Sequence, residues 1–161
     1  MQPLNLNGAA ASEVLIARVA LAVITQEAVK SVDGSETGGV LLGHDVEKLV
    51  VQFAGGPGPN AVHRPDRFHR DLRHAQDLAS VAWQEDRSQW IGEWHTHPSG
   101  VLEPSQTDLR SYLRHLHDPE LRLERFLSVI VSVDESGVQA VAWVVQPSAT
   151  YLVPLRVKEE E

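Results

Sequence analysis

The pattern of apolar and polar positions predicts three helices in this chain. Near the start, apolar residues fall three or four positions apart, which is the spacing of one helix face. Ser12 or Glu13 can begin a helix there that runs to about Lys30. A second helix is expected over 68–86 and a third over 105–117. The apolar positions that mark the first two are Val14, Ala17, Leu21, Ile24 and Ala28, then Leu72, Ala75, Leu78 or Ala79, and Ala82.

Strands are expected between and after these helices. Residues 38–43 and 48–53 are apolar runs joined by a polar turn, which is typical of a hairpin, and the Gly/Pro-rich stretch 54–65 is too irregular for either element. Another strand begins at Trp90. Beyond the charged connector 118–125, the apolar runs are 126–133 and 138–145, joined by the turn 134–137, and finally 150–157. This mixture predicts an α/β fold with a mixed β-sheet wrapped by about three helices.

Composition predicts one globular domain over residues 1–161. The chain is 42% hydrophobic and 22% charged, and a net charge of -8 works against binding to nucleic acid. The longest apolar run, 14–24, is short and contains Arg18, so neither a membrane span nor a signal peptide is expected. The absence of cysteine excludes disulfides and thiolate metal sites. We expect a cytoplasmic protein with no membrane partner.

Two histidines and an aspartate are the candidate metal-binding residues. His95 and His97 are two residues apart on an expected strand, so both imidazoles point to one face and can reach one ion. Pro104 suits the first turn of a helix, on which Ser105 and Asp108 lie three residues apart. Two imidazoles and a carboxylate are the ligands of a catalytic zinc whose fourth position is left for water. The site is therefore expected where a strand ends and a helix begins.

Simpler explanations exist for the same residue types. His115 and His117 are also two apart, but on a helix they point about 200° apart, so we expect solvated helix surface there. Ser105 alone could be a helix cap, and Asp108 alone could complement the helix dipole. Their spacing relative to the two histidines favours the metal site.

Together, His95, His97, Pro98, Ser105 and Asp108 form the pattern H-x-H-P, six residues, S-x-x-D, which resembles the JAMM motif of the JAB/MPN metalloprotease family. The family also has a glutamate well upstream in a context like E-x-G-G-x-L-x-G. Here Glu36 begins such a segment. The resemblance covers roughly residues 36–145. The segments 56–62 and 92–98 look most like the stand-alone prokaryotic JAB proteins, which accompany bacterial ubiquitin-like conjugation operons and anti-phage loci.

The resemblance implies a zinc peptidase or isopeptidase. Zinc held by His95, His97 and Asp108 would lower the pKa of a water far below its ordinary value, to roughly 7. Glu36 would act as general base, and the Ser105 hydroxyl would donate to the oxyanion of the tetrahedral intermediate. The implied substrate is an amide bond after the C-terminal tail of a ubiquitin-like protein, in deconjugation or maturation. E1-like and E2-like enzymes of the same system are the implied partners.

Several further residues near the motif are candidates for the surroundings of the site. Glu93 shares strand parity with the two histidines and competes with Glu36 as the base, although it is interpreted as orienting a ligand. The loop residues Asn60, His63 and Arg64 could line a substrate channel, yet such a loop usually has no role in a site. Among the tryptophans, Trp94 could wall the substrate groove, while core positions are expected for Trp83, Trp90 and Trp143.

Four other functions compete with the peptidase. A cupin-like oxygenase would use H-x-H with Glu103, but helices on both sides of the motif argue against an all-β barrel. A zinc nucleobase deaminase needs a P-C-x-x-C pair, which this chain lacks. The family also includes a DNA-repair-associated branch, which the net charge disfavours, and non-enzymatic MPN scaffolds, which typically lack the metal ligands.

Overall fold

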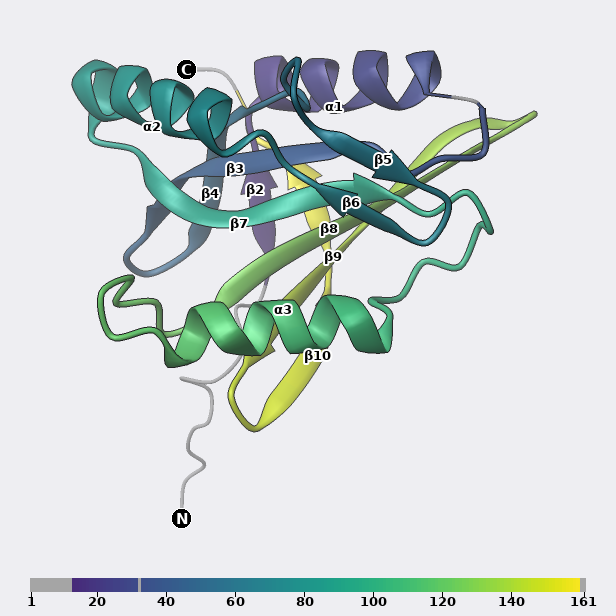
Figure 1. The fold of residues 1–161 in the computed structure, drawn as a ribbon. Coiled ribbons are helices and arrows are strands. Elements are labelled where there is room, and N and C mark those ends of the chain that lie inside the picture. The colour runs from purple at the N-terminus through teal and green to yellow at the C-terminus, as the bar shows by residue number, and fades with distance from the viewer. Residues whose placement is uncertain (1–12, 32, 160–161) are drawn as a thin grey trace.

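The chain forms a curled mixed β-sheet with three helices in the residues that the computed structural model describes, 13–31 and 33–159 (Figure 1). The helices are α1 (Arg18–Lys30), α2 (Leu72–Asp86) and α3 (Gln106–His117). The main sheet contains β2 (Val14–Ile16), β3 (Gly38–Asp45), β4 (Leu49–Ala54), β7 (Gln89–Thr96), β8 (Phe126–Asp134), β9 (Gly137–Gln146), β10 (Ala149–Val153) and β11 (Leu155–Val157). A separate hairpin pairs β5 (Val62–Arg64) with β6 (Arg67–His69).

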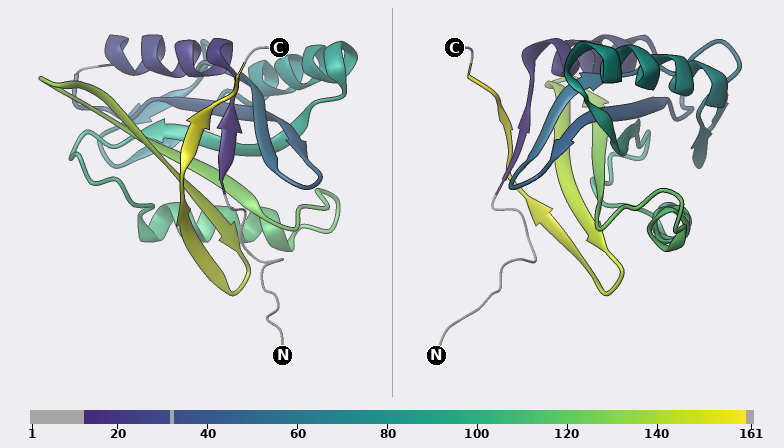
Figure 2. Two further views of the ribbon diagram at one scale, coloured as in Figure 1. Left: turned by 180° about the vertical axis from the view of Figure 1, so that it is seen from behind. Right: turned by 90° about the vertical axis from the view of Figure 1, so that its left-hand side faces the viewer.

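The sheet bends until its two ends meet. Its strand order is β10-β9-β8-β7-β3-β4-β2-β11, with parallel pairing of β7 with β8, β4 with β2, and β2 with β11. The end strands β10 and β11 are separated in the chain only by Pro154, whose carbonyl accepts a hydrogen bond from the Val14 N–H at 2.8 Å. Proline cannot donate to a ladder, so it suits the point where the chain passes from one end of the sheet to the other. Figure 2 shows this bend from two further sides.

Alternate strand residues pack against different helices. The larger core cluster joins Leu41, Val129 and Val144 to the buried face of α1, formed by Ala20, Ile24 and Ala28. On the opposite face, Val40 and Leu42 of β3 pack against Ala75 and Ala82 of α2. Tyr112 of α3 packs with Phe126 and Val145 on that same face. Three helices thus cover both faces of a mixed sheet, which confirms the predicted fold class.

The start of the first helix was predicted wrongly. Val14 and Ile16 are buried in the short strand β2, and α1 begins only at Arg18. Ser12 lies outside the described residues. Two ladders, to β4 and β11, hold β2 in the sheet, so pairing with distant segments overrides the helical spacing of its apolar residues.

Two further boundaries differ from the prediction. Residues 68 and 69, expected as the start of the second helix, belong to β6, and α2 starts at Leu72 because the Asp71 side chain caps it by accepting from the His74 N–H at 3.1 Å. The stretch 54–65, expected to be irregular, contributes β5. The last predicted strand is interrupted at Pro154 and becomes β10 and β11.

No helix in residues 13–31 and 33–159 has both the length and the apolar composition that a bilayer crossing needs.

Candidate metal centre

The pairing of β3 with β7 places Glu36 beside the two histidines, although about 60 residues separate them in the chain. In this antiparallel ladder Gly38 is opposite His95. The pairing extends past the strand ends, because the Thr96 N–H donates to the Thr37 carbonyl at 2.8 Å and the Thr37 N–H to the Thr96 hydroxyl at 2.9 Å. Two positions before Gly38, Glu36 therefore lies level with His97. A Cβ on Gly38 would lie 2.9 Å from that of His95, so glycine permits this close approach.

One atom from each of His95, His97 and Asp108 converges on a common point. The two histidine Nε2 atoms lie 3.0 Å apart, and the Asp108 Oδ2 atom lies 3.1 Å from the His95 Nε2 and 3.2 Å from the His97 Nε2. A tetrahedral zinc with bonds of about 2.0 to 2.1 Å keeps its ligand atoms about 3.3 to 3.4 Å apart. The nearly equilateral triangle is close to one face of such a tetrahedron, so the donor set fits a zinc ion.

The orientation of the His97 ring also suits a metal ligand. Its Nδ1 atom lies 2.8 Å from the carbonyl oxygen of Val101. A carbonyl only accepts, so Nδ1 carries the proton and the Nε2 atom of the neutral ring presents a lone pair. Metal-binding histidines are usually oriented by such a bond on the other ring nitrogen.

Burial opposes protonation of His95, but the hydrogen bond and charge of Asp108 outweigh it and raise the pKa of His95.

Ser105 and Asp108 form a helix cap, and Asp108 also reaches the two histidines. The Ser105 hydroxyl accepts from the Asp108 N–H at 3.0 Å, while the Asp108 Oδ2 accepts from the Ser105 N–H at 2.8 Å, which is a complete capping box. The helix-cap interpretation and the metal-site interpretation are therefore compatible, because the cap also fixes the Asp108 carboxylate beside the two imidazoles. Since the Ser105 oxygen acts as acceptor in the cap, its own proton remains available to a substrate.

Two carboxylates lie at or near the convergence point, and their pKa values are shifted in opposite directions. One ligand atom each of Glu36, His95 and His97 lies within 4.8 Å of the others. Burial raises the pKa of Glu36 to about 7, although the two histidines partly oppose this, and its buried Oε1 has no hydrogen-bond partner. For Asp108, burial is outweighed by hydrogen bonds from both histidines, and its pKa is lowered. Asp108 is thus the better permanent anion for a cation, and Glu36 the better proton carrier.

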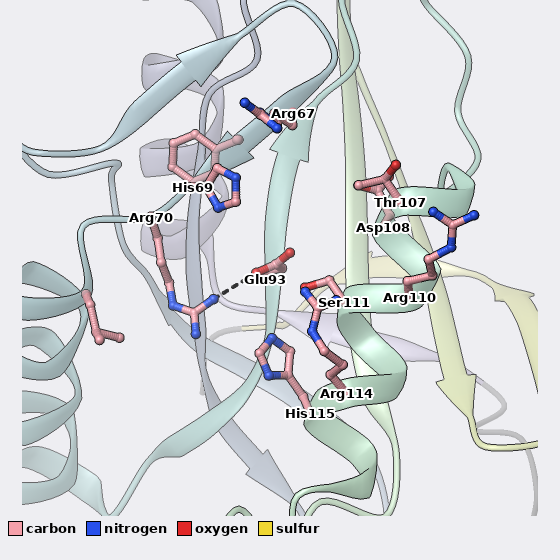
Figure 3. Close-up of a pocket in the computed structure, with 12 residues that line it drawn as sticks. Arg67, His69, Arg70, Glu93, Thr107, Asp108, Arg110, Ser111, Arg114 and His115 are labelled. Atoms are coloured by element: carbon pink, nitrogen blue, oxygen red, sulfur yellow. Dashed lines mark hydrogen bonds and ion pairs between the residues drawn. The ribbon is translucent and has the colours of Figure 1, made fainter.

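Glu93 lies on the same face of β7 but points into a neighbouring cleft (Figure 3). Its Oε2 atom forms an ion pair with the Arg70 guanidinium at 3.3 Å. Burial raises the pKa of Glu93, and the positive charge of Arg70 opposes this. No direct hydrogen bond between Glu93 and either histidine occurs in the described residues. The expected role of Glu93 in orienting a metal ligand is therefore not supported by a direct contact.

Two of the three loop residues considered for a substrate channel, His63 and Arg64, contact the main chain of Glu36. The Arg64 carbonyl accepts from the Glu36 N–H at 2.8 Å, and the His63 Nδ1 lies 2.9 Å from the Glu36 carbonyl oxygen. The strand β5 therefore holds the main chain of Glu36 from the side opposite to β7. Asn60 lies further away, where its N–H donates to Asp71 at 3.0 Å.

Two tryptophan expectations need correction. Trp94 does not wall a groove, because it is fully buried and its Nε1–H donates to the Gly55 carbonyl at 2.8 Å. Trp83, expected in the core, is 45% exposed. Trp90 and Trp143 are half-buried. Strand parity explains Trp94, since neighbouring side chains of β7 point to opposite faces and His95 points toward the site.

The expectation for His115 is also wrong, and a test of pH dependence follows. Its half-buried ring packs edge-on against Trp90 and stacks on Phe126, with ring centroids 5.0 and 5.5 Å away. Desolvation by burial, aided by the charges of Arg70 and Arg114, lowers the pKa of His115 to about 4. The unfolded chain then binds more protons between pH 6.5 and 4, so His115 should reduce the free energy of unfolding as the pH falls through that window.

In His115→Phe, urea unfolding should show a smaller loss of stability between pH 7 and 4 than in the unmodified chain. The full pKa change corresponds to about 3 kcal/mol, which solvent screening of this partly exposed ring reduces to about 1–2 kcal/mol. Parallel stability curves for the two proteins would contradict this prediction.

Comparisons with known proteins agree with this geometry. The family model described as "Prokaryotic homologs of the JAB domain" matches residues 18–146. A curated Enterobacter hormaechei protein named "CD-NTase/cGAS isopeptidase" is 28% identical over 129 residues, which cover 78% of this chain and 69% of that protein. A Vibrio cholerae protein of the same name is 33% identical over 91 residues, covering 55% of this chain and 58% of its own length.

Two further similarities extend over most of the chain. "Probable metalloprotease y4qB" of Sinorhizobium fredii is 28% identical over 130 residues, covering 76% of this chain and 78% of that protein. The solution structure of protein DSY2949 from Desulfitobacterium hafniense superimposes with a TM-score of 0.68 at 18% identity. It covers 91% of this chain and 94% of that one. At that identity the likeness concerns the fold alone.

Proposed function

Because the chain belongs to the family of prokaryotic homologues of the JAB domain, we propose that it is a zinc-dependent isopeptidase or peptidase that cleaves the amide bond after the C-terminal tail of a ubiquitin-like protein. The observation that carries the proposal is the triangle of His95, His97 and Asp108 ligand atoms beside the buried, unpartnered carboxyl of Glu36. The names of the curated relatives, isopeptidase and metalloprotease, support the same class of reaction.

His95, His97 and Asp108 are the residues that would hold the metal. When bound, a divalent cation supplies Lewis acidity, which makes a water nucleophilic near neutral pH and polarises the scissile carbonyl. The capping box holds the Asp108 carboxylate in place, and the Val101 carbonyl holds the ring of His97. These bonds position the ligands before any ion arrives.

Glu36 is the proposed general base and acid. It accepts the proton of the attacking water at its carboxylate and then passes that proton to the leaving amine, so no acyl-enzyme is needed. Its burial and free Oε1 atom suit this exchange, since no other hydrogen bond competes for the proton. The Ser105 hydroxyl donates its remaining hydrogen to the oxyanion of the tetrahedral intermediate.

The substrate is proposed to be an extended tail that reaches the site along the β5–β6 hairpin. This hairpin is not part of the main sheet, and β6 pairs only with β5 among the described residues. A tail can add to a strand edge through main-chain hydrogen bonds. The relatives' name suggests a protein of the CD-NTase type as the conjugated target. The family resemblance suggests an anti-phage system with E1-like and E2-like enzymes.

The proposal is tested by incubating the zinc-loaded protein with fusions of ubiquitin-like tails and reading new C-termini by mass spectrometry. We expect cleavage after the tail, its loss with a chelator, and its return when zinc is restored. Metal binding without cleavage of any fusion would favour a scaffold. Salt-dependent DNA binding would favour the DNA-repair-associated branch of the family.

A further inference from the structure

We propose that the cleft beside the metal centre, named here the arginine cleft, binds an acidic segment of the substrate protein next to the scissile bond. The cleft is defined by Arg67, Arg70, Arg110 and Arg114, with Glu93 at its floor and Asp108 at its metal-centre end. The location of the scissile bond rests on the proposed function, whereas the affinity for acidic peptide does not.

The arginine cleft has two walls from distant parts of the chain. One wall comes from β6 and the start of α2, the other from the face of α3 that carries Arg110 and Arg114, and the volume between them is about 480 Å³ (Figure 3). On α3, the lining side chains run from Thr107 to His115, a rise of eight residues or roughly 12 Å of helix. That length matches about three to four residues of extended peptide. The cleft therefore suits a short segment that continues from the metal centre.

The charges in the cleft contrast with those of the whole protein. Four of the 14 basic residues of a chain with net charge -8 line this one cleft. The two acids that line it are already compensated, Glu93 by Arg70 at 3.3 Å and Asp108 by the two histidines. Arg67, Arg110 and Arg114 are exposed and make no ion pair within the described part of the chain. Positive charge is therefore left available for an anionic ligand.

The arrangement on α3 supports a ligand rather than a structural role. Arg110 and Arg114 are four residues apart, a spacing at which like charges repel and slightly destabilise a helix. Arginine forks match carboxylates in a bidentate manner, and the lining hydroxyls of Thr107 and Ser111 offer further donors. A long nucleic acid would extend beyond the cleft over a negatively charged protein, so an acidic peptide is the favoured ligand.

Binding is tested in the Glu36→Gln variant, in which cleavage cannot deplete the ligand. A fluorescent peptide with a short run of glutamates is compared by anisotropy with its glutamine analogue. We expect the acidic peptide to bind about tenfold or more tightly, with affinity falling as salt rises. Arg110→Gln/Arg114→Gln should remove most of this preference. The matched control is Arg73→Gln/Arg122→Gln, which changes the same charge at exposed positions outside the cleft and should stay within about twofold.

Equal affinity for the acidic and glutamine peptides, or an unchanged preference in Arg110→Gln/Arg114→Gln, would overturn the inference. So would a single-stranded oligonucleotide that binds more tightly than the acidic peptide and is released by the same double substitution. Charge-dependent peptide binding in a protein that cleaves no fusion would leave the arginine cleft in place and refute the proposed function instead. The two failures are therefore distinguishable.

Discussion

Replacing Glu36 with glutamine is expected to lower the rate of amide hydrolysis by about 10²- to 10⁴-fold while zinc stays bound. The amide keeps the size of the side chain but cannot accept and return a proton. Glu36 is the buried carboxyl beside the histidines that has an unpartnered oxygen, and it is not needed for the triangle of ligand atoms. The loss should therefore appear in kcat, with zinc content measured on the same sample.

Two matched glutamates make this result specific. Glu103→Gln changes the same group at an exposed position and should leave turnover unchanged. Glu93→Gln removes the partner of Arg70 in the neighbouring cleft, so its main effect should be on KM for the substrate. If Glu93→Gln abolished turnover with zinc retained, and Glu36→Gln did not, the assignment of the base would be wrong.

The convergence of Glu36, His95, His97 and Asp108 was predictable in large part because most of their spacing is local. Strand parity places His95 and His97 on one face, and a helix N-terminus places Asp108 near Ser105. Only Glu36 needs a long-range feature, the register of β3 against β7, and no local pattern encodes that register. The family resemblance supplied that residue, and the observed ladder explains how it arrives beside His97.

The missed elements share a physical cause. The strands β2, β5 and β6 are each three residues long, too short for alternation to be recognised. The strand β2 is held by pairing with the distant strands β4 and β11, whereas β5 and β6 pair with each other across a two-residue turn. The arginine cleft was missed for a related reason. Its members come from β6, the start of α2 and α3, and only the four-residue spacing of Arg110 and Arg114 was visible in the sequence.

Substituting His97 with alanine should weaken zinc binding by about 100-fold or more and abolish cleavage at limiting zinc. Zinc bound by four protein ligands gains about 10–16 kcal/mol, so one ligand contributes roughly 3 kcal/mol. In the unmodified chain, zinc at about 1,000 times its Kd should stabilise the fold by about 4 kcal/mol, which raises Tm by roughly 8–16 °C for this chain length. The same zinc concentration should raise the Tm of His97→Ala by less than half as much.

The control for this prediction is His117→Ala, because His117 is exposed at the last turn of α3 and its side chain is outside the triangle. It should bind zinc, gain Tm and cleave like the unmodified chain. Since the capping box and the hydrogen bonds of Thr37 with Thr96 do not involve the His97 ring, the metal-free fold should survive the His97 substitution. Zinc affinity and cleavage equal to those of His117→Ala would therefore mean that His97 is not a ligand, and the proposed centre would have to be abandoned.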